Sequence, residues 1–205
     1  MKHAFLAAVA ALGLGATSAS AITYSFEDLL PGGGGSLIAS EFSLDVTAID
    51  AGVIFSIMND VAVSEYSPRG RSVGFEDSLG LLTNPMISGT NVSFATANGN
   101  LPQSNRNYDE FVFAATQGND SATIGDGETL DLTFELNGTT TFDDVIAALN
   151  SGSLLVGLHV ISINGVDPSS DTITTIGEVP LPAGLPLLLA GVGAFGLMRR
   201  KRKAA

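Results

Sequence analysis

Residues Thr129 to Leu136 alternate strictly between apolar and polar side chains. Leucine and phenylalanine occupy every second position, and aspartate, threonine and glutamate stand between them. Because successive side chains of a strand point to opposite faces, this pattern predicts a strand with one buried face. Phe42 to Thr47 repeats the alternation. The sequence therefore indicates an all-β fold, since a helix would need an apolar period of 3.6.

Further strands are expected along the chain, together with one short helix. The apolar residues Phe142, Val145, Ile146 and Leu149 share one face of a helix over about 142–150, with Thr141 at its N-terminal cap. The other expected strands are Ile22 to Asp28, Val53 to Met58, Arg71 to Glu76, Leu79 to Leu82, Asn91 to Ala95, Glu110 to Ala115 and Leu154 to Ile163. Many short strands with one helix predict a two-sheet β-sandwich, jelly-roll-like in topology.

The N-terminus has the three parts of a secretory signal. Lys2 supplies the positive charge, an apolar run follows, and Ala19 and Ala21 provide the small residues that a signal peptidase accepts. We therefore expect residues 1–21 to form a signal peptide with an apolar signal helix. Signal peptidase would cleave before Ile22.

The C-terminus carries a second apolar segment, residues 181–198, which is followed at once by basic residues. Its 18 residues would form a helix about 27 Å long, close to the hydrocarbon thickness of about 30 Å. The basic residues are Arg199, Arg200, Lys201, Arg202 and Lys203. Positive charge stays on the cytoplasmic side, so we expect a transmembrane helix with the preceding body outside the inner membrane.

The residues between these ends are strongly acidic and contain no cysteine. All 21 acidic residues lie between Glu27 and Glu178, against only three arginines, which gives this part a net charge of −18. Such a domain repels phosphate backbones, so no nucleic-acid partner is expected. Without disulfides, an exported domain must be stabilised by its apolar core. We expect an acidic β-sandwich domain over 22–168 and a linker over 169–178.

A short motif precedes the C-terminal apolar segment and resembles a known sorting signal. Val179, Pro180, Leu181, Pro182 and Ala183 stand before the apolar span and the basic end. This order closely resembles the VPLPA variant of the PEP-CTERM sorting signals of Gram-negative bacteria, VPLPA-CTERM. The match covers residues 179–203 only.

The resemblance implies that an exosortase recognises the motif, cuts near it, and releases the body to the cell surface or extracellular matrix. Proteins of this kind are associated with exopolysaccharide and biofilm, so the resemblance also implies extracellular polysaccharide as a partner. Two prolines would keep the motif extended at the membrane face, where an enzyme could bind it. A tail that stays uncut and anchors the protein permanently is the alternative.

We expect no enzymatic activity and no catalytic residue. His159 is the single histidine left after export, and its place in an apolar strand indicates a core or edge histidine. The adjacent acidic pairs are Glu27–Asp28, Glu76–Asp77, Asp109–Glu110 and Asp143–Asp144. A carboxylate-based glycosidase is the enzymatic alternative, because it needs two facing carboxyl groups about 5–10 Å apart.

No cofactor is expected, with calcium as the one ion that the sequence favours. Asp120, Asp126, Glu128 and Asp131 lie in and beside one loop, and calcium prefers several oxygen ligands. Solvated acidic loops have the same composition. The leading hypothesis is therefore a non-enzymatic surface or matrix interaction module. A carbohydrate-binding or glycan-cleaving module is the alternative, and an exposed row of Tyr24, Tyr66 and Tyr108 would favour sugar binding.

Overall fold

The computed structural model describes residues 21–29, 34–60, 65–116 and 122–176. They form a mostly β structure with two short α-helices and one 3₁₀ turn, η1 (Ala39–Glu41). The strands are β1 (Ala21–Asp28), β2 (Phe42–Ile49), β3 (Gly52–Asn59), β4 (Arg69–Asp77), β5 (Leu82–Thr90), β6 (Phe94–Ala97), β7 (Phe111–Ala115), β8 (Thr129–Leu136), β9 (Leu154–Ile161) and β10 (Asp171–Thr175). The all-β expectation is confirmed.

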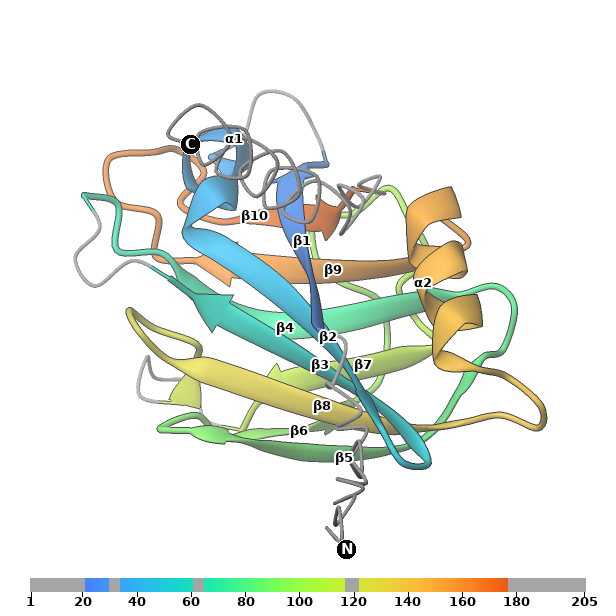
Figure 1. The fold of residues 1–205 in the computed structure, drawn as a ribbon. Helices are drawn as coiled ribbons and strands as arrows, with labels where there is room; N and C mark the ends of the chain where they lie inside the picture. The colour runs from blue at the N-terminus through green and yellow to red at the C-terminus, as the bar shows by residue number, and fades with distance from the viewer. Residues whose placement is uncertain (1–20, 30–33, 61–64, 117–121, 177–205) are drawn as a thin grey trace, which may run out of the picture.

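The ten strands form one antiparallel sheet, in the order β5-β8-β3-β2-β1-β10-β9-β4-β7-β6 (Figure 1). Strand β1 joins the two halves of the sheet, because its two ends pair with different strands. Residues Ala21–Ser25 pair with β2, and Phe26–Asp28 pair with β10. The N-terminal strand therefore holds both halves together.

Aromatic rings from the two halves meet in the core. Phe55 of β3 lies 5.2 Å from Phe75 of β4, measured between ring centroids. Phe134 of β8 contacts Phe75 and the β7 rings of Phe111 and Phe113 at centroid distances of 5.0–6.2 Å. These strands are not neighbours in the sheet order, so the core brings together rings from separate parts of the sheet. Edge-to-face rings of this kind add to the stabilisation from apolar burial.

Helix α2 (Phe142–Ser151) confirms the helix predicted over about 142–150. The Thr141 side chain accepts from the Asp144 backbone N–H, and the Asp144 carboxylate accepts from the Thr141 backbone N–H at 2.8 Å. This is a capping box with aspartate in the place of glutamate. Gly152 ends the helix in the left-handed conformation, at φ 73°.

Three elements differ from the expectation. Residues Asp171–Thr175, expected within the linker over 169–178, form strand β10, and all five of its residues are buried. The linker prediction is wrong for these residues, because threonine and aspartate are buried here through hydrogen bonds rather than apolar packing. A second short helix, α1 (Gly35–Ile38), was not expected. Strand β5 begins where the predicted strand Leu79–Leu82 ends.

The predicted signal helix in residues 1–21 lies outside the described residues, apart from Ala21, and the predicted transmembrane helix 181–198 lies wholly outside them. Within the described residues, the helices are too short to cross a bilayer.

Candidate functional site

Two glycines paired in register create a flat patch on the outer face of the sheet. Gly74 of β4 lies opposite Gly157 of β9. A Cβ atom on Gly74 would lie 2.7 Å from Cβ of Tyr108, and one on Gly157 would lie 2.7 Å from Cδ1 of Leu101. Tyr108 and Leu101 fill this space and are buried. The missing side chains therefore allow the 98–110 loop to pack directly on the sheet.

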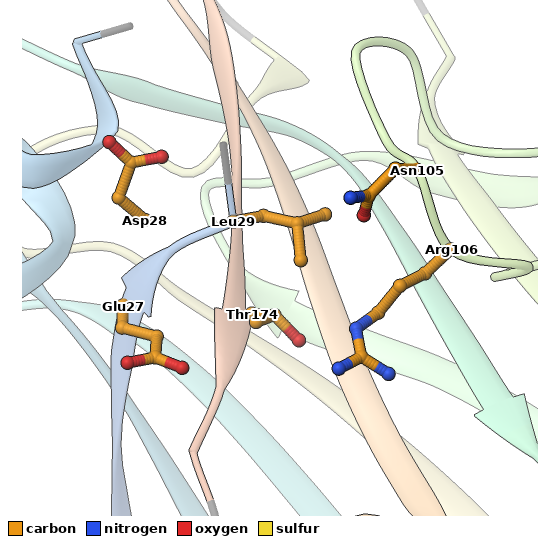
Figure 2. Close-up of a pocket in the computed structure, with 6 residues that line it drawn as sticks. All are labelled: Glu27, Asp28, Leu29, Asn105, Arg106 and Thr174. Carbon is orange, nitrogen blue, oxygen red and sulfur yellow. The ribbon is translucent and has the colours of Figure 1, made fainter. Parts of the chain in front are cut away.

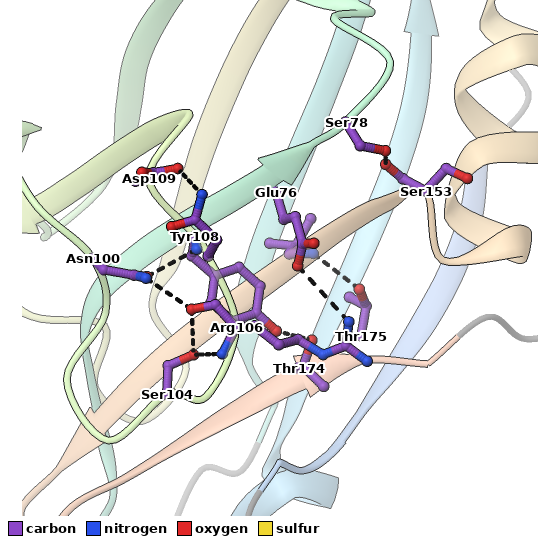
Figure 3. Close-up of polar contacts among 12 residues, drawn as sticks. Glu76, Ser78, Asn100, Ser104, Arg106, Tyr108, Asp109, Ser153, Thr174 and Thr175 are labelled. Carbon is purple, nitrogen blue, oxygen red and sulfur yellow. Dashed lines mark hydrogen bonds and ion pairs between the residues drawn. The ribbon is translucent and has the colours of Figure 1, made fainter.

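Hydrogen bonds then hold the loop in one conformation (Figure 3). The Tyr108 hydroxyl donates to Oγ1 of Thr174 on β10. Asn100 Oδ1 accepts from the Tyr108 backbone N–H at 2.8 Å, and Asn100 Nδ2 donates to the Arg106 carbonyl at 2.7 Å. Burial raises the pKa of the Tyr108 hydroxyl, so this group remains a donor at neutral pH.

The ordered loop forms one wall of an open polar pocket of about 410 Å³. Glu27 of β1 and Thr174 of β10 are register partners, and the loop brings Arg106 to the opposite side (Figure 2). Among the described residues, its lining is Glu27, Asp28, Leu29, Asn105, Arg106 and Thr174. We call this the Glu27–Arg106 pocket.

The pocket combines donors, acceptors and one apolar side chain. Arg106 and Asn105 can donate, Glu27 can accept, and Leu29 offers an apolar contact. Arg106 Nη1 lies 3.8 Å from Oε2 of Glu76, but both side chains are partly exposed, so this ion pair is weak. This arrangement suits a ligand with several hydroxyl groups.

Two of the four predicted carboxylate pairs, Glu76–Asp77 and Asp109–Glu110, line one pocket in the structure. Glu76 and Asp77 follow one another on β4, so their side chains leave opposite faces. Asp77 Oδ2 accepts from the Leu82 backbone N–H at 2.9 Å. Asp28 turns toward α1, where it accepts from the Ser36 backbone N–H at 3.1 Å. Four of the predicted acids line a second pocket of about 150 Å³, whose lining is Glu76, Asp77, Ser78, Asn107, Asp109 and Glu110.

The residues predicted to bind calcium have separate surroundings. Glu128 Oε2 accepts from the Gly125 backbone N–H at 2.7 Å, and Asp131 Oδ1 accepts from the Ser56 hydroxyl at 2.6 Å. Asp126 is exposed, and Asp120 lies outside the described residues. Within the described ranges, no three histidine, aspartate or glutamate side chains are grouped to hold a metal ion. Calcium therefore stays the alternative to the expectation of no cofactor.

His159 is a buried histidine of the central strand β9, as the sequence predicted. Its Nδ1 lies 3.3 Å from the Thr172 hydroxyl oxygen. Burial lowers the pKa of His159, and the neighbouring Asp171 opposes this shift in part. The ring is therefore held mainly in its neutral form.

An exposed row of Tyr24, Tyr66 and Tyr108, which would have favoured sugar binding, is absent from the described residues. Tyr24 and Tyr108 are fully buried, because one packs in the main core and the other under its own loop. Tyr66 is half-buried against the core. Sugar stacking on this set of rings is therefore excluded.

The predicted signal-cleavage and sorting residues belong to the two ends of the chain. Ala19, the motif Val179 to Ala183 and the basic end Arg199 to Lys203 all lie outside the described residues. Ala21 is the first residue of β1, where it is exposed and pairs with Thr47.

The sequence alone did not predict that Thr174, Asn105 and Arg106 line one pocket. The available signals were indirect: glycines within the apolar strands around Gly74 and Gly157, and a single arginine in a loop rich in asparagine. No protein-family model, curated protein or solved structure matches this chain.

Proposed function

We propose that this chain is an exported cell-surface or extracellular-matrix protein that is processed at both ends. The supporting observation is the extent of the strands, which begin at Ala21 and end at Thr175. Cleavage before Ile22 and near Val179 would leave the remaining residues of β1 and all of β10 in place. The two sorting signals thus flank the described strands, and only Ala21 of β1 would be removed with the signal peptide.

In this proposal signal peptidase removes residues 1–21 during export. The helix over 181–198 then holds the protein in the inner membrane, with Arg199 to Lys203 in the cytoplasm. An exosortase acts at the motif Val179 to Ala183 and releases the body. The body serves as a non-enzymatic interaction module linked to extracellular polysaccharide.

The fold proposed for this module is a two-sheet β-sandwich of the jelly-roll type. Strand β1 divides its pairing between β2 and β10, as a strand at a sandwich corner does. The contacts of Phe55 and Phe134 with rings of β4 and β7 support two facing layers.

Mass spectrometry of the protein recovered from culture fluid tests the processing. The expected chain starts at Ile22 and ends between Val179 and Ala183. A variant with Pro180→Ala and Pro182→Ala should retain the C-terminal residues, because the motif would lose its fixed extended shape. Recovery of Arg199 to Lys203 on the surface form of the unaltered protein would instead support a permanently anchored protein with an uncut tail.

A carbohydrate-binding or glycan-cleaving module is the second candidate, and the Glu27–Arg106 pocket favours it. Glu27 is exposed and faces the pocket, so Glu27→Gln should weaken binding of a neutral oligosaccharide. Glu65→Gln makes the same chemical change at an exposed residue outside both pockets and should leave binding unchanged. Calorimetry measures binding, and the release of reducing ends from the same oligosaccharide would indicate cleavage.

A further inference from the structure

One row of side chains crosses five neighbouring strands and alternates between hydroxyl and carboxylate groups. In register across β1, β2, β3, β8 and β5, the row consists of Thr23, Asp45, Ser56, Asp131 and Ser88. Thr23 Oγ1 donates to Asp45 Oδ1 at 2.5 Å, and Ser56 Oγ donates to Asp131 Oδ1 at 2.6 Å. Neighbouring strands lie about 4.8 Å apart, so the row extends about 19 Å across the sheet. We call it the hydroxyl–carboxylate row.

Of the rows on either side, one has four hydroxyl side chains, and the other has two hydroxyl side chains among three apolar ones. One flanking row is Ser25, Ser43, Met58, Thr129 and Thr90, and the other is Ala21, Thr47, Ile54, Thr133 and Met86. All of these residues are exposed or half-exposed, whereas the alternate residues of the same strands, such as Leu44, Phe55 and Leu132, are fully buried. Figure 1 shows β1, β2, β3 and β8 side by side in one layer. The three rows therefore form one exposed and mostly polar face, which we call the hydroxyl face.

Charge is distributed unevenly between the two halves of the sheet. Among the described residues, the basic side chains are Arg69 and Arg71 on β4 and Arg106 in the 98–110 loop. Strands β1, β2, β3, β8 and β5 contain none, although they carry Asp45, Asp131 and further acids. The hydroxyl face is therefore uniformly anionic, which opposes polyanions and attracts cations.

We propose that the hydroxyl face binds a cationic amino-sugar polysaccharide. Charge complementarity argues for protonated amines, which pair with Asp45 and Asp131. The surrounding serine and threonine hydroxyls can both donate and accept hydrogen bonds, which argues for a partner that itself carries hydroxyl groups. An extended sugar chain can follow the row across several strands. This inference rests on the proposed function in one respect: both assume that the protein meets the polysaccharide outside the cell.

Calorimetry on the full chain, purified in mild detergent, tests the binding. The probe is a β-1,4-linked glucosamine oligomer at mildly acidic pH, and its N-acetylated, uncharged counterpart is the comparison ligand. We expect the glucosamine oligomer to bind more tightly and to lose affinity as salt is added. The double variant Asp45→Asn and Asp131→Asn should weaken its binding by about fivefold or more. These substitutions keep the side-chain oxygens that accept from Thr23 and Ser56, and circular dichroism checks that the variant is folded.

Asp143→Asn is the control, because it removes one exposed carboxylate from α2, outside the three rows. Thr47→Val and Thr133→Val remove two hydroxyl groups from the hydroxyl face and keep the shape of each side chain. They should weaken binding of the glucosamine oligomer but leave binding of an oligolysine unchanged.

Equal binding of the charged and acetylated oligomers, or a double variant that behaves like Asp143→Asn, would overturn the proposal. Oligolysine binding with no effect of the threonine variants on the sugar would assign the face to a basic peptide instead. Mass spectrometry of the termini is independent, so failed processing and failed binding are distinguishable.

Discussion

At the scale of single residues, the absence of two side chains determines where the 98–110 loop lies. Gly74 and Gly157 allow Tyr108 and Leu101 to pack against the sheet, and Tyr108 then reaches Thr174. The position of Arg106 in the pocket follows from this packing.

Gly74→Ala should therefore lower the free energy of unfolding by about 1–3 kcal/mol. The added methyl group would lie 2.7 Å from Cβ and 2.9 Å from the backbone oxygen of Tyr108, so the loop itself would have to move. Urea unfolding measures the loss. Gly70→Ala on the same strand is the control, because its methyl would meet only side-chain atoms at 3.1 Å or more. Equal effects of the two changes would contradict this account.

Tyr24 should make stability fall at alkaline pH. Burial raises the pKa of Tyr24 to about 12, from a model-compound value of 10.0. The neutral hydroxyl is thus favoured in the folded state. Its contribution to the free energy of unfolding is complete below pH 10 and is lost as the pH rises toward 12. Tyr24→Phe should show a smaller fall in the free energy of unfolding between pH 9 and about 11.5. Urea titrations at these pH values measure it, and an unchanged fall would refute the assignment to Tyr24.

At the scale of secondary structure elements, α2 is stabilised by local interactions at both ends. The capping box of Thr141 and Asp144 satisfies N–H groups at the first turn, and Gly152 ends the last turn. Hydrogen bonds from the Thr141 side chain and backbone lower the pKa of Asp144. The buried face, with Val145, Ala148 and Leu149, then packs on the core.

Thr141→Ala should lower the free energy of unfolding by about 1 kcal/mol, because an orphan N–H group loses its acceptor. The pKa of Asp144 should rise toward its ordinary value at the same time. Urea unfolding and a carboxyl-carbon NMR titration measure the two effects. Thr139→Ala, an exposed change two residues before the cap, should alter neither quantity. A stability loss with no change in the pKa of Asp144 would argue against the capping box.

At the scale of the whole molecule, negative charge dominates. The 21 acidic residues and three arginines between the two ends give a net charge of −18, and these like charges repel one another in the compact state. Among the described residues, two arginines lie on β4 and the third lies in the 98–110 loop, which packs on β4 and β9. The other half of the sheet presents the hydroxyl face.

Added salt should therefore raise the thermal midpoint, by about 3 °C between 20 and 500 mM, because it screens this repulsion. Scanning calorimetry measures the change, and sodium and potassium chloride should act alike. A midpoint that falls or stays constant would contradict the role of net charge. A larger rise in calcium chloride at equal ionic strength would support the calcium site predicted around Asp120.

Local signals in the sequence determined the all-β class, strand β8 with its bounds, helix α2 with its cap, and the burial of His159. Side-chain periodicity and capping depend only on residues close in the chain, so the sequence contains them directly. Only the tertiary structure decided the rest. Strand β10 is buried because other elements pack around it and not because its sequence is apolar. The Tyr108 hydroxyl donates to a threonine 66 residues away in the chain. The hydroxyl–carboxylate row forms only when five strands pair in the observed register. Pairing between distant segments depends on the packing of the whole core, which no single segment of sequence specifies.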